Sequence, residues 1–123
     1  MAQSFRDLQV WQRAMQLTEA VYRLTQEFPR EELFGLSGQL RRSAVSIPSF
    51  AEGQGRLSAK EFRQFLGIAR GSTCEVQTQL EIAQKLGFGS PALIDRAGAL
   101  AEEARKMLFG LLESLRNPHK AKL

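Results

Sequence analysis

The first quarter of the chain carries apolar side chains in a pattern that a helix presents as continuous stripes. Between Asp7 and Phe28 these side chains recur at alternating intervals of three and four residues, along two neighbouring seams. The first seam is Leu8, Trp11, Met15, Thr18, Tyr22 and Thr25, and the second is Val10, Ala14, Leu17, Val21, Leu24 and Phe28. Together they cover an arc of roughly 200°, where a simple surface helix needs little more than about 100°.

An apolar arc this wide favours assembly of several copies of the chain. One seam can face the core of the subunit, and the other is expected to face a second copy. The pattern alone leaves open which seam does which. We predict that the interface between copies contains Val10, Leu17, Val21 and Leu24.

Three further helices are predicted from residues that typically begin, break or end a helix. Pro29 ends the first helix, and Pro48 is expected to kink or break the second because proline removes an amide and crowds the preceding turn. The third should begin at the capping box formed by Ser58 and Glu61 and stop at Gly87. The fourth should run from Ser90-Pro91 to Asn117-Pro118.

No segment alternates with a period of two, so we predict no strand. Four helices with short connections predict an all-α, up-down-up-down four-helix bundle. A chain of 123 residues has room for one core, and we expect a single domain over residues 1–117 followed by a basic tail, residues 118–123.

Basic side chains are concentrated in the middle of the chain. Residues 41–70 hold six basic and two acidic side chains, a local charge of +4, which equals the net charge of the whole protein. Clustered positive charge attracts polyanions. We therefore predict phosphate contacts, without base stacking, from Arg41, Arg42, Arg56, Lys60, Arg63 and Arg70. The alternatives are a solvated surface, or pairing of these side chains with Glu52, Glu61 or Glu75.

Residues suited to catalysis or metal binding are scarce. The one histidine, His119, lies in the basic tail without the spacing of a helical metal site. The one cysteine, Cys74, is more typical of packing than of a nucleophile, and it cannot form an internal disulfide. Gly53-Gln54-Gly55 lacks the third glycine of a dinucleotide-binding motif. We therefore expect no enzyme, no metal and no cofactor.

The expected location is the cytoplasm, without a membrane partner. The longest apolar stretch, residues 107–112, is far shorter than the about 20 residues that span a bilayer. The first residues lack a basic and then apolar leader, so no secretion signal is expected. A single cysteine fits a reducing compartment.

Small side chains follow one line of the predicted third helix. Gly67, Gly71, Cys74 and Thr78 form this line. A glycine inside a helix costs about 1 kcal/mol relative to alanine, so a compensating contact is expected. We predict that Gly67 and Gly71 allow close helix packing, inside the bundle or between copies. The alternative is a functional face, because Lys60, Arg63 and Arg70 lie along the same side.

Several motifs along residues 5 to 88 resemble one known family. They are Phe5-x-x-Leu8-x-Val10-Trp11-Gln12, Phe28-Pro29, Glu32-x-Phe34-Gly35-Leu36, Gln39-Leu40-Arg41-Arg42-Ser43-Ala44-Val45-Ser46-Ile47-Pro48, Ala51-Glu52-Gly53, Glu61-Phe62-x-x-Phe65-Leu66-x-Ile68-Ala69-x-Gly71-Ser72, Glu75 and Gln79-Leu80. This pattern resembles the four-helix-bundle family encoded in intervening sequences of bacterial 23S ribosomal RNA genes. It is also similar to the accessory variability proteins of diversity-generating retroelements.

The resemblance implies a homopentamer of four-helix bundles with a basic surface for RNA or another nucleic acid. Its intervening-sequence branch has no established enzymatic role. The first functional hypothesis is therefore a non-enzymatic, homo-oligomeric nucleic-acid-binding protein, with structured RNA as the expected ligand. The second is a protein-interaction scaffold or accessory subunit, for example for a reverse transcriptase, as in the retroelement branch.

Overall fold

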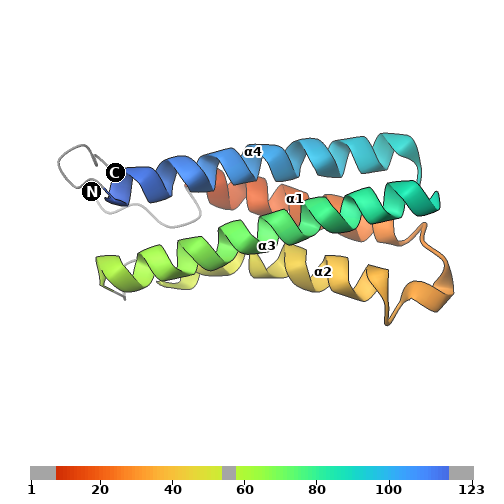
Figure 1. The fold of residues 1–123 in the computed structure, drawn as a ribbon, viewed down its shortest axis with the longest axis horizontal. Coiled ribbons are helices and arrows are strands. Elements are labelled where there is room, and N and C mark those ends of the chain that lie inside the picture. Colours follow the sequence, from red (N-terminus) through yellow and green to blue (C-terminus); the bar gives the residue numbers. More distant parts are fainter. Residues whose placement is uncertain (1–7, 54–57, 117–123) are drawn as a thin grey trace.

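A computed structural model of the protein describes residues 8–53 and 58–116. Within these residues the secondary structure is entirely helical: α1 (Gln9–Thr25), η2 (Arg30–Glu32), α2 (Leu36–Ser46), η3 (Pro48–Gly53), α3 (Ala59–Leu86) and α4 (Pro91–Arg116). Successive α-helices run in opposite directions (Figure 1). Helix α1 packs against α2 and α4, and α3 packs against the same two helices. The predicted all-α architecture with four α-helices is confirmed.

Helix α3 begins and ends at the predicted capping residues. The Ser58 hydroxyl accepts a hydrogen bond from the Glu61 amide at 3.2 Å, and the Glu61 carboxylate accepts one from the Ser58 amide at 3.3 Å. Gly87 ends the helix with a φ of 74°, a left-handed conformation that glycine adopts without a steric penalty. Helix α4 begins at Pro91, as predicted. Its predicted stop at residues 117–118 lies outside the described residues.

Pro48 breaks the second helix. Helix α2 ends at Ser46, and the chain continues from Pro48 as the 3-10 helix η3. Two serine hydroxyls donate hydrogen bonds to backbone carbonyls near the break. Ser46 donates to the Ser43 carbonyl at 2.7 Å, and Ser49 donates to the Ser46 carbonyl at 2.6 Å. Helix η3 also returns the fully buried Phe50 to the core, so the break does not interrupt the apolar packing.

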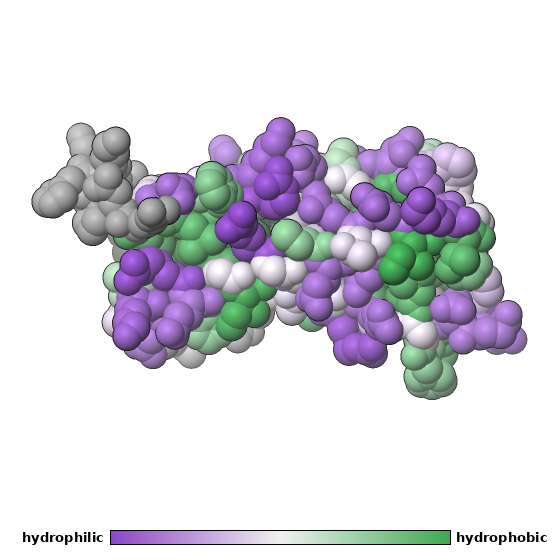
Figure 2. Space-filling view, viewed as in Figure 1, coloured by the Kyte–Doolittle hydropathy of each residue, from purple (hydrophilic) through white to green (hydrophobic). Residues whose placement is uncertain are grey.

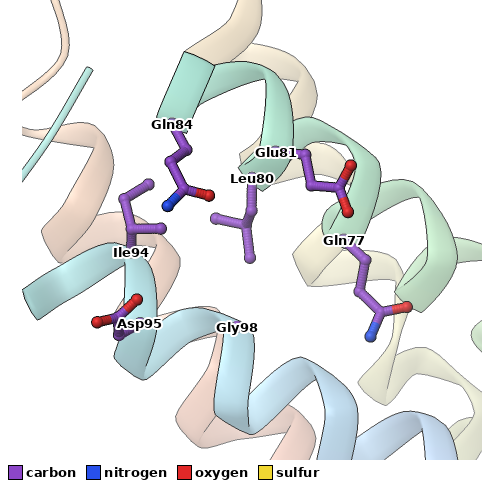
Figure 3. Close-up of a pocket in the computed structure, with 7 residues that line it drawn as sticks. All are labelled: Gln77, Leu80, Glu81, Gln84, Ile94, Asp95 and Gly98. Atoms are coloured by element: carbon purple, nitrogen blue, oxygen red, sulfur yellow. The ribbon is translucent and has the colours of Figure 1, made fainter. Parts of the chain in front are cut away.

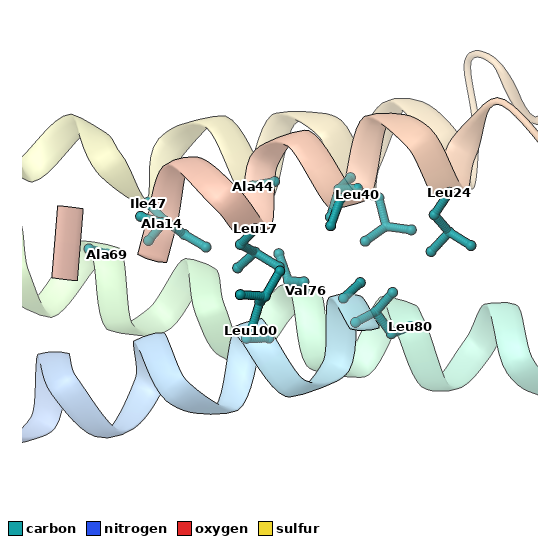
Figure 4. Packing of buried hydrophobic residues seen from close by; sticks show 14 of the residues in the cluster. Ala14, Leu17, Leu24, Leu40, Ala44, Ile47, Ala69, Val76, Leu80 and Leu100 are labelled. Carbon is teal, nitrogen blue, oxygen red and sulfur yellow. The ribbon is translucent and has the colours of Figure 1, made fainter. Parts of the chain in front are cut away.

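The hydrophobic core runs along the axis of the bundle and receives side chains from all four α-helices (Figure 4). It receives the whole second seam, which runs from Val10 to Leu24 on α1 and ends with Phe28 just beyond that helix, and every residue of the seam is buried. Four residues of this seam are predicted from the sequence to lie at an interface between copies, and the structure corrects that prediction. They fill the subunit's own core: Val10, Leu17, Val21 and Leu24.

The first seam of α1 lies towards α2. The Thr18 hydroxyl donates to the Ala44 carbonyl of α2 at 3.2 Å, and the Tyr22 ring lies 5.0 Å from the Arg41 guanidinium carbon. Met15 and Tyr22 remain 37% and 42% exposed. The wide apolar arc thus arises because α1 packs against the core and a neighbouring helix at once. It does not require a second copy of the chain.

Candidate nucleic-acid interface

The six predicted phosphate contacts differ in their surroundings. Arg42, Lys60, Arg63 and Arg70 are exposed on α2 and α3. Arg41 is partly buried, and its Nε donates to the Thr25 hydroxyl at 2.8 Å. That bond and the Tyr22 ring hold Arg41 against α1, so the structure separates it from the other cations. Arg56 lies outside the described residues.

The exposed cations extend along α3 and onto α2 and do not form one compact cluster. The Arg70 guanidinium carbon lies 5.0 Å from the ring centroid of Phe109, on the side of α3 that faces α4. Arg63 is two helical turns from Arg70 on the same side, a rise of about 10.5 Å. Arg42 projects from α2, on the other side of α3. Figure 2 shows hydrophilic and hydrophobic residues interspersed over the face that contains α3.

None of these exposed cations forms an ion pair with an acidic side chain within the described residues. The ion pairs there join Arg13 to Glu103 and Arg105 to Glu102, each at 2.6 Å. The Glu61 carboxylate accepts from Ser58 instead. The structure therefore contradicts the alternative in which Glu61 or Glu75 forms ion pairs with the arginines. The Glu52 side chain lies outside the description.

Gly67 and Gly71 lie on the exposed face of α3. A Cβ atom added at either glycine would meet no atom within 4 Å. The prediction that these glycines allow close helix packing inside the bundle is therefore wrong. Packing between copies stays a prediction. Cys74, on the same line, is exposed as well.

A groove between α3 and α4 is unsuited to phosphate. It has a volume of about 470 Å³ and is lined by Gln77, Leu80, Glu81, Gln84, Ile94, Asp95 and Gly98 (Figure 3). Leu80 and Ile94 are buried at its floor. The only ionisable lining groups are the carboxylates of Glu81 and Asp95, which repel polyanions.

Glu102 links α3 and α4 beside this groove. Its carboxylate accepts from Arg105 Nε at 2.6 Å and from Arg105 Nη2 at 2.9 Å, and Gln77 Nε2 of α3 donates to it at 3.0 Å. The hydrogen bonds from Arg105, followed by the one from Gln77, lower the pKa of Glu102 from 4.5 to about 2. Because the pKa is lowered in the folded state, this stabilisation is present above about pH 4.5 and is lost as the pH falls towards 2.

Replacing Arg105 tests the cause of this shift. In the Arg105→Ala variant we expect the pKa of Glu102 to rise towards its ordinary value, because the largest stabilising contact to the carboxylate is gone. Carboxyl carbon chemical shifts followed by NMR during an acid titration measure it. Gln77→Ala serves as the comparison and should produce a smaller rise. An unchanged Glu102 pKa in Arg105→Ala would refute the assigned cause.

A second groove, between α2 and α3, brings polar side chains together that the sequence reasoning did not group. Its volume is about 430 Å³, and its lining consists of Gln39, Arg42, Ser43, Ser46, Ser72, Glu75 and Gln79. Their spacing of three or four residues within each helix was the available signal. Charge does not reveal this group, because five of its seven members are uncharged serines and glutamines.

Metal and membrane features are absent from the structure as far as it is described. Residues 8–53 and 58–116 contain no group of three or more His, Cys, Asp or Glu side chains placed to hold a metal ion. None of the described helices combines the length and apolar character needed to cross a bilayer.

The fold and this surface define an all-helical protein that presents exposed cations on α2 and α3. The family described as 23S rRNA-intervening sequence protein matches residues 6–110, most of the chain. The chain belongs to this family, so the resemblance identified from the sequence motifs is confirmed on this point. The similarity to retroelement accessory proteins stays a prediction. A comparison with curated proteins finds no match.

Proposed function

We propose that this protein is a non-enzymatic, homo-oligomeric nucleic-acid-binding protein whose ligand is structured RNA. The observation that carries the proposal is the set of exposed cations without ion pairs among the described residues: Arg42, Lys60, Arg63 and Arg70. Charged groups that no carboxylate neutralises are available to phosphates. The description of the family names 23S rRNA, which favours RNA over DNA.

Arginine suits this role because its planar guanidinium can bind a phosphate through two hydrogen bonds. Arg63 and Arg70 are spaced to reach different phosphates of one strand, and Arg42 extends the surface onto α2. Two aromatic residues of α3 lie between these cations in the sequence. Phe62 packs against the core, and Phe65, which is 38% exposed, points about 200° around the helix from Arg63. Neither ring forms a stacking platform beside the arginines, so the contacts carry weak sequence preference.

Self-assembly is the second part of the proposal. The exposed line of Gly67, Gly71, Cys74 and Thr78 is continued one turn later by Ile82, which is 42% exposed. The C-terminal half of this line, Cys74, Thr78 and Ile82, suits contact with another helix, because Arg63 and Arg70 share the side of Gly67 and Gly71 and must stay open to phosphate. The pentamer implied by the resemblance would repeat the basic surface and add weak contacts through multivalency.

A scaffold function is the alternative, and one observation favours it. Phe34, in the connection between η2 and α2, is 93% exposed, and the neighbouring Leu33 is 51% exposed. Exposed large apolar side chains of this kind are typical of protein contacts. An accessory subunit would dock a protein partner, such as a polymerase, at this end of the bundle.

RNA binding and a scaffold function are distinguished by measuring RNA affinity at several salt concentrations. Affinity of the purified protein for a labelled RNA hairpin should fall steeply between about 50 and 200 mM salt, because phosphate contacts release counterions. Light scattering at micromolar concentration should give a mass above that of the 13.8 kDa subunit. Absence of RNA binding at low salt, or a flat salt dependence, would defeat the RNA proposal. A monomeric mass would defeat the assembly proposal.

A further inference from the structure

The groove between α2 and α3 is polar on every side. All seven lining residues are polar or charged, and all belong to the motifs that carry the family resemblance. Helix α2 supplies four of them and α3 supplies three. A solvent-accessible groove with this lining is suited to a small polar group and unsuited to an apolar one.

Hydrogen-bonding capacity inside the groove is only partly used by the protein. The buried Oε1 atom of Gln79 has no hydrogen-bond partner, while its Nε2 donates to the Ser43 hydroxyl at 3.3 Å. The Ser46 and Ser72 hydroxyls lie 2.6 Å apart and join the two helices. An unpaired buried acceptor is rare in folded proteins. Gln79 lines the groove, so rotation of its amide would present this oxygen to an external donor.

Opposite charges line the same groove without forming an ion pair with each other. Arg42 is exposed on α2 and Glu75 is exposed on α3, and neither takes part in the ion pairs of the described residues. A ligand that complements both must present an anionic group and a hydrogen-bond donor. A phosphate joined to a hydroxyl-bearing sugar has both.

Resting on the proposed function, we propose that this groove binds a ribose-phosphate unit of RNA and distinguishes RNA from DNA. Arg42 binds the phosphate, and Glu75, an exposed acceptor of the groove, receives a hydrogen bond from the ribose 2′-hydroxyl. The groove is an open surface depression of about 430 Å³, which suits one unit of a longer polymer better than a free small molecule that needs enclosure.

Glu75 gives the proposal its sharpest consequence. A carboxylate near a phosphate weakens binding of any polyanion unless it also forms a favourable contact. RNA compensates with the 2′-hydroxyl donor, whereas DNA cannot, since deoxyribose lacks that group. Removal of Glu75 should therefore weaken RNA binding and strengthen DNA binding. A purely electrostatic surface would strengthen both.

The experiment compares one hairpin sequence made as RNA, as DNA and as 2′-O-methyl RNA, using fluorescence anisotropy at fixed low salt. The unmodified protein should bind RNA about tenfold tighter than either of the other two, which lack the donor. In Glu75→Ala we expect about a tenfold loss of RNA affinity, the size associated with a hydrogen bond to a charged group. DNA affinity should rise, so the RNA preference disappears.

Glu81→Ala is the matched control. Glu81 is exposed on the same helix but lines the acidic groove towards α4, and its removal changes the net charge equally. It should leave the ratio of RNA to DNA affinity unchanged. Equal binding of RNA and DNA by the unmodified protein would overturn the groove assignment while leaving nucleic-acid binding intact. So would a Glu75→Ala variant that gains RNA affinity as Glu81→Ala does. Failure to bind any nucleic acid would instead overturn the proposed function itself.

Discussion

Leu17→Ala should lower the free energy of unfolding by about 2–5 kcal/mol, the range for removing a leucine side chain from a well-packed core. Leu17 is 0% exposed, at the middle of α1, among side chains from the other helices of the bundle (Figure 4). The substitution removes the apolar contacts and leaves a cavity that the surrounding helices fill only in part. Urea denaturation followed by circular dichroism measures the change.

Met15→Ala provides the matched control for this substitution. Met15 lies on the first seam of the same helix, two residues away, and is 37% exposed. Its truncation should change the free energy of unfolding by less than about 1 kcal/mol. If Leu17→Ala left stability unchanged but reduced the mass of the assembly, the second seam would belong to an interface between copies after all.

Removal of three exposed arginines should weaken RNA binding about a hundredfold at low salt. The variant Arg42→Ala/Arg63→Ala/Arg70→Ala removes cations that form no ion pairs among the described residues. Each lost phosphate contact also lowers the slope of log affinity against log salt, by about 0.7 for a single strand and about 0.9 for a duplex. The slope should therefore fall by about 2 to 3. Titrations of one RNA hairpin at several salt concentrations give both quantities.

A second triple variant separates the position of the charges from their number. Arg23→Ala/Arg96→Ala/Lys106→Ala removes the same three positive charges from exposed positions on α1 and α4. Arg23 and Arg96 line a groove between those helices, away from α2 and α3. This variant should lose less than about tenfold in affinity. Equal losses in the two variants would show that net charge alone drives binding, without a surface on α2 and α3.

Local signals in the sequence predicted the helices because their causes are local. The capping box at Ser58, the left-handed Gly87 and the helix-breaking Pro48 act on backbone groups within one turn of themselves. Hydrophobic spacing identified the buried stripes for the same reason. Neither kind of signal contains information about which other helix a stripe meets.

The candidate surface could be predicted only in part. Counting charges found the exposed cations of α2 and α3, but it did not show that Arg41 is held by Thr25 and Tyr22 of α1. It also did not show that Arg42 shares a groove with Glu75. These relations depend on the rotation of each helix about its axis and on its neighbours, which spacing within one helix does not specify.

By itself, the sequence determined the all-helical class, the break at Pro48, both ends of α3, the start of α4, and the family. Tertiary structure decided the roles of the two seams of α1 and exposed Gly67 and Gly71. It also assembled the polar groove from segments about 30 residues apart. The physical reason is that helix formation follows from bonds and contacts between residues three or four apart, whereas a surface is formed by side chains that only the packing of whole helices brings together.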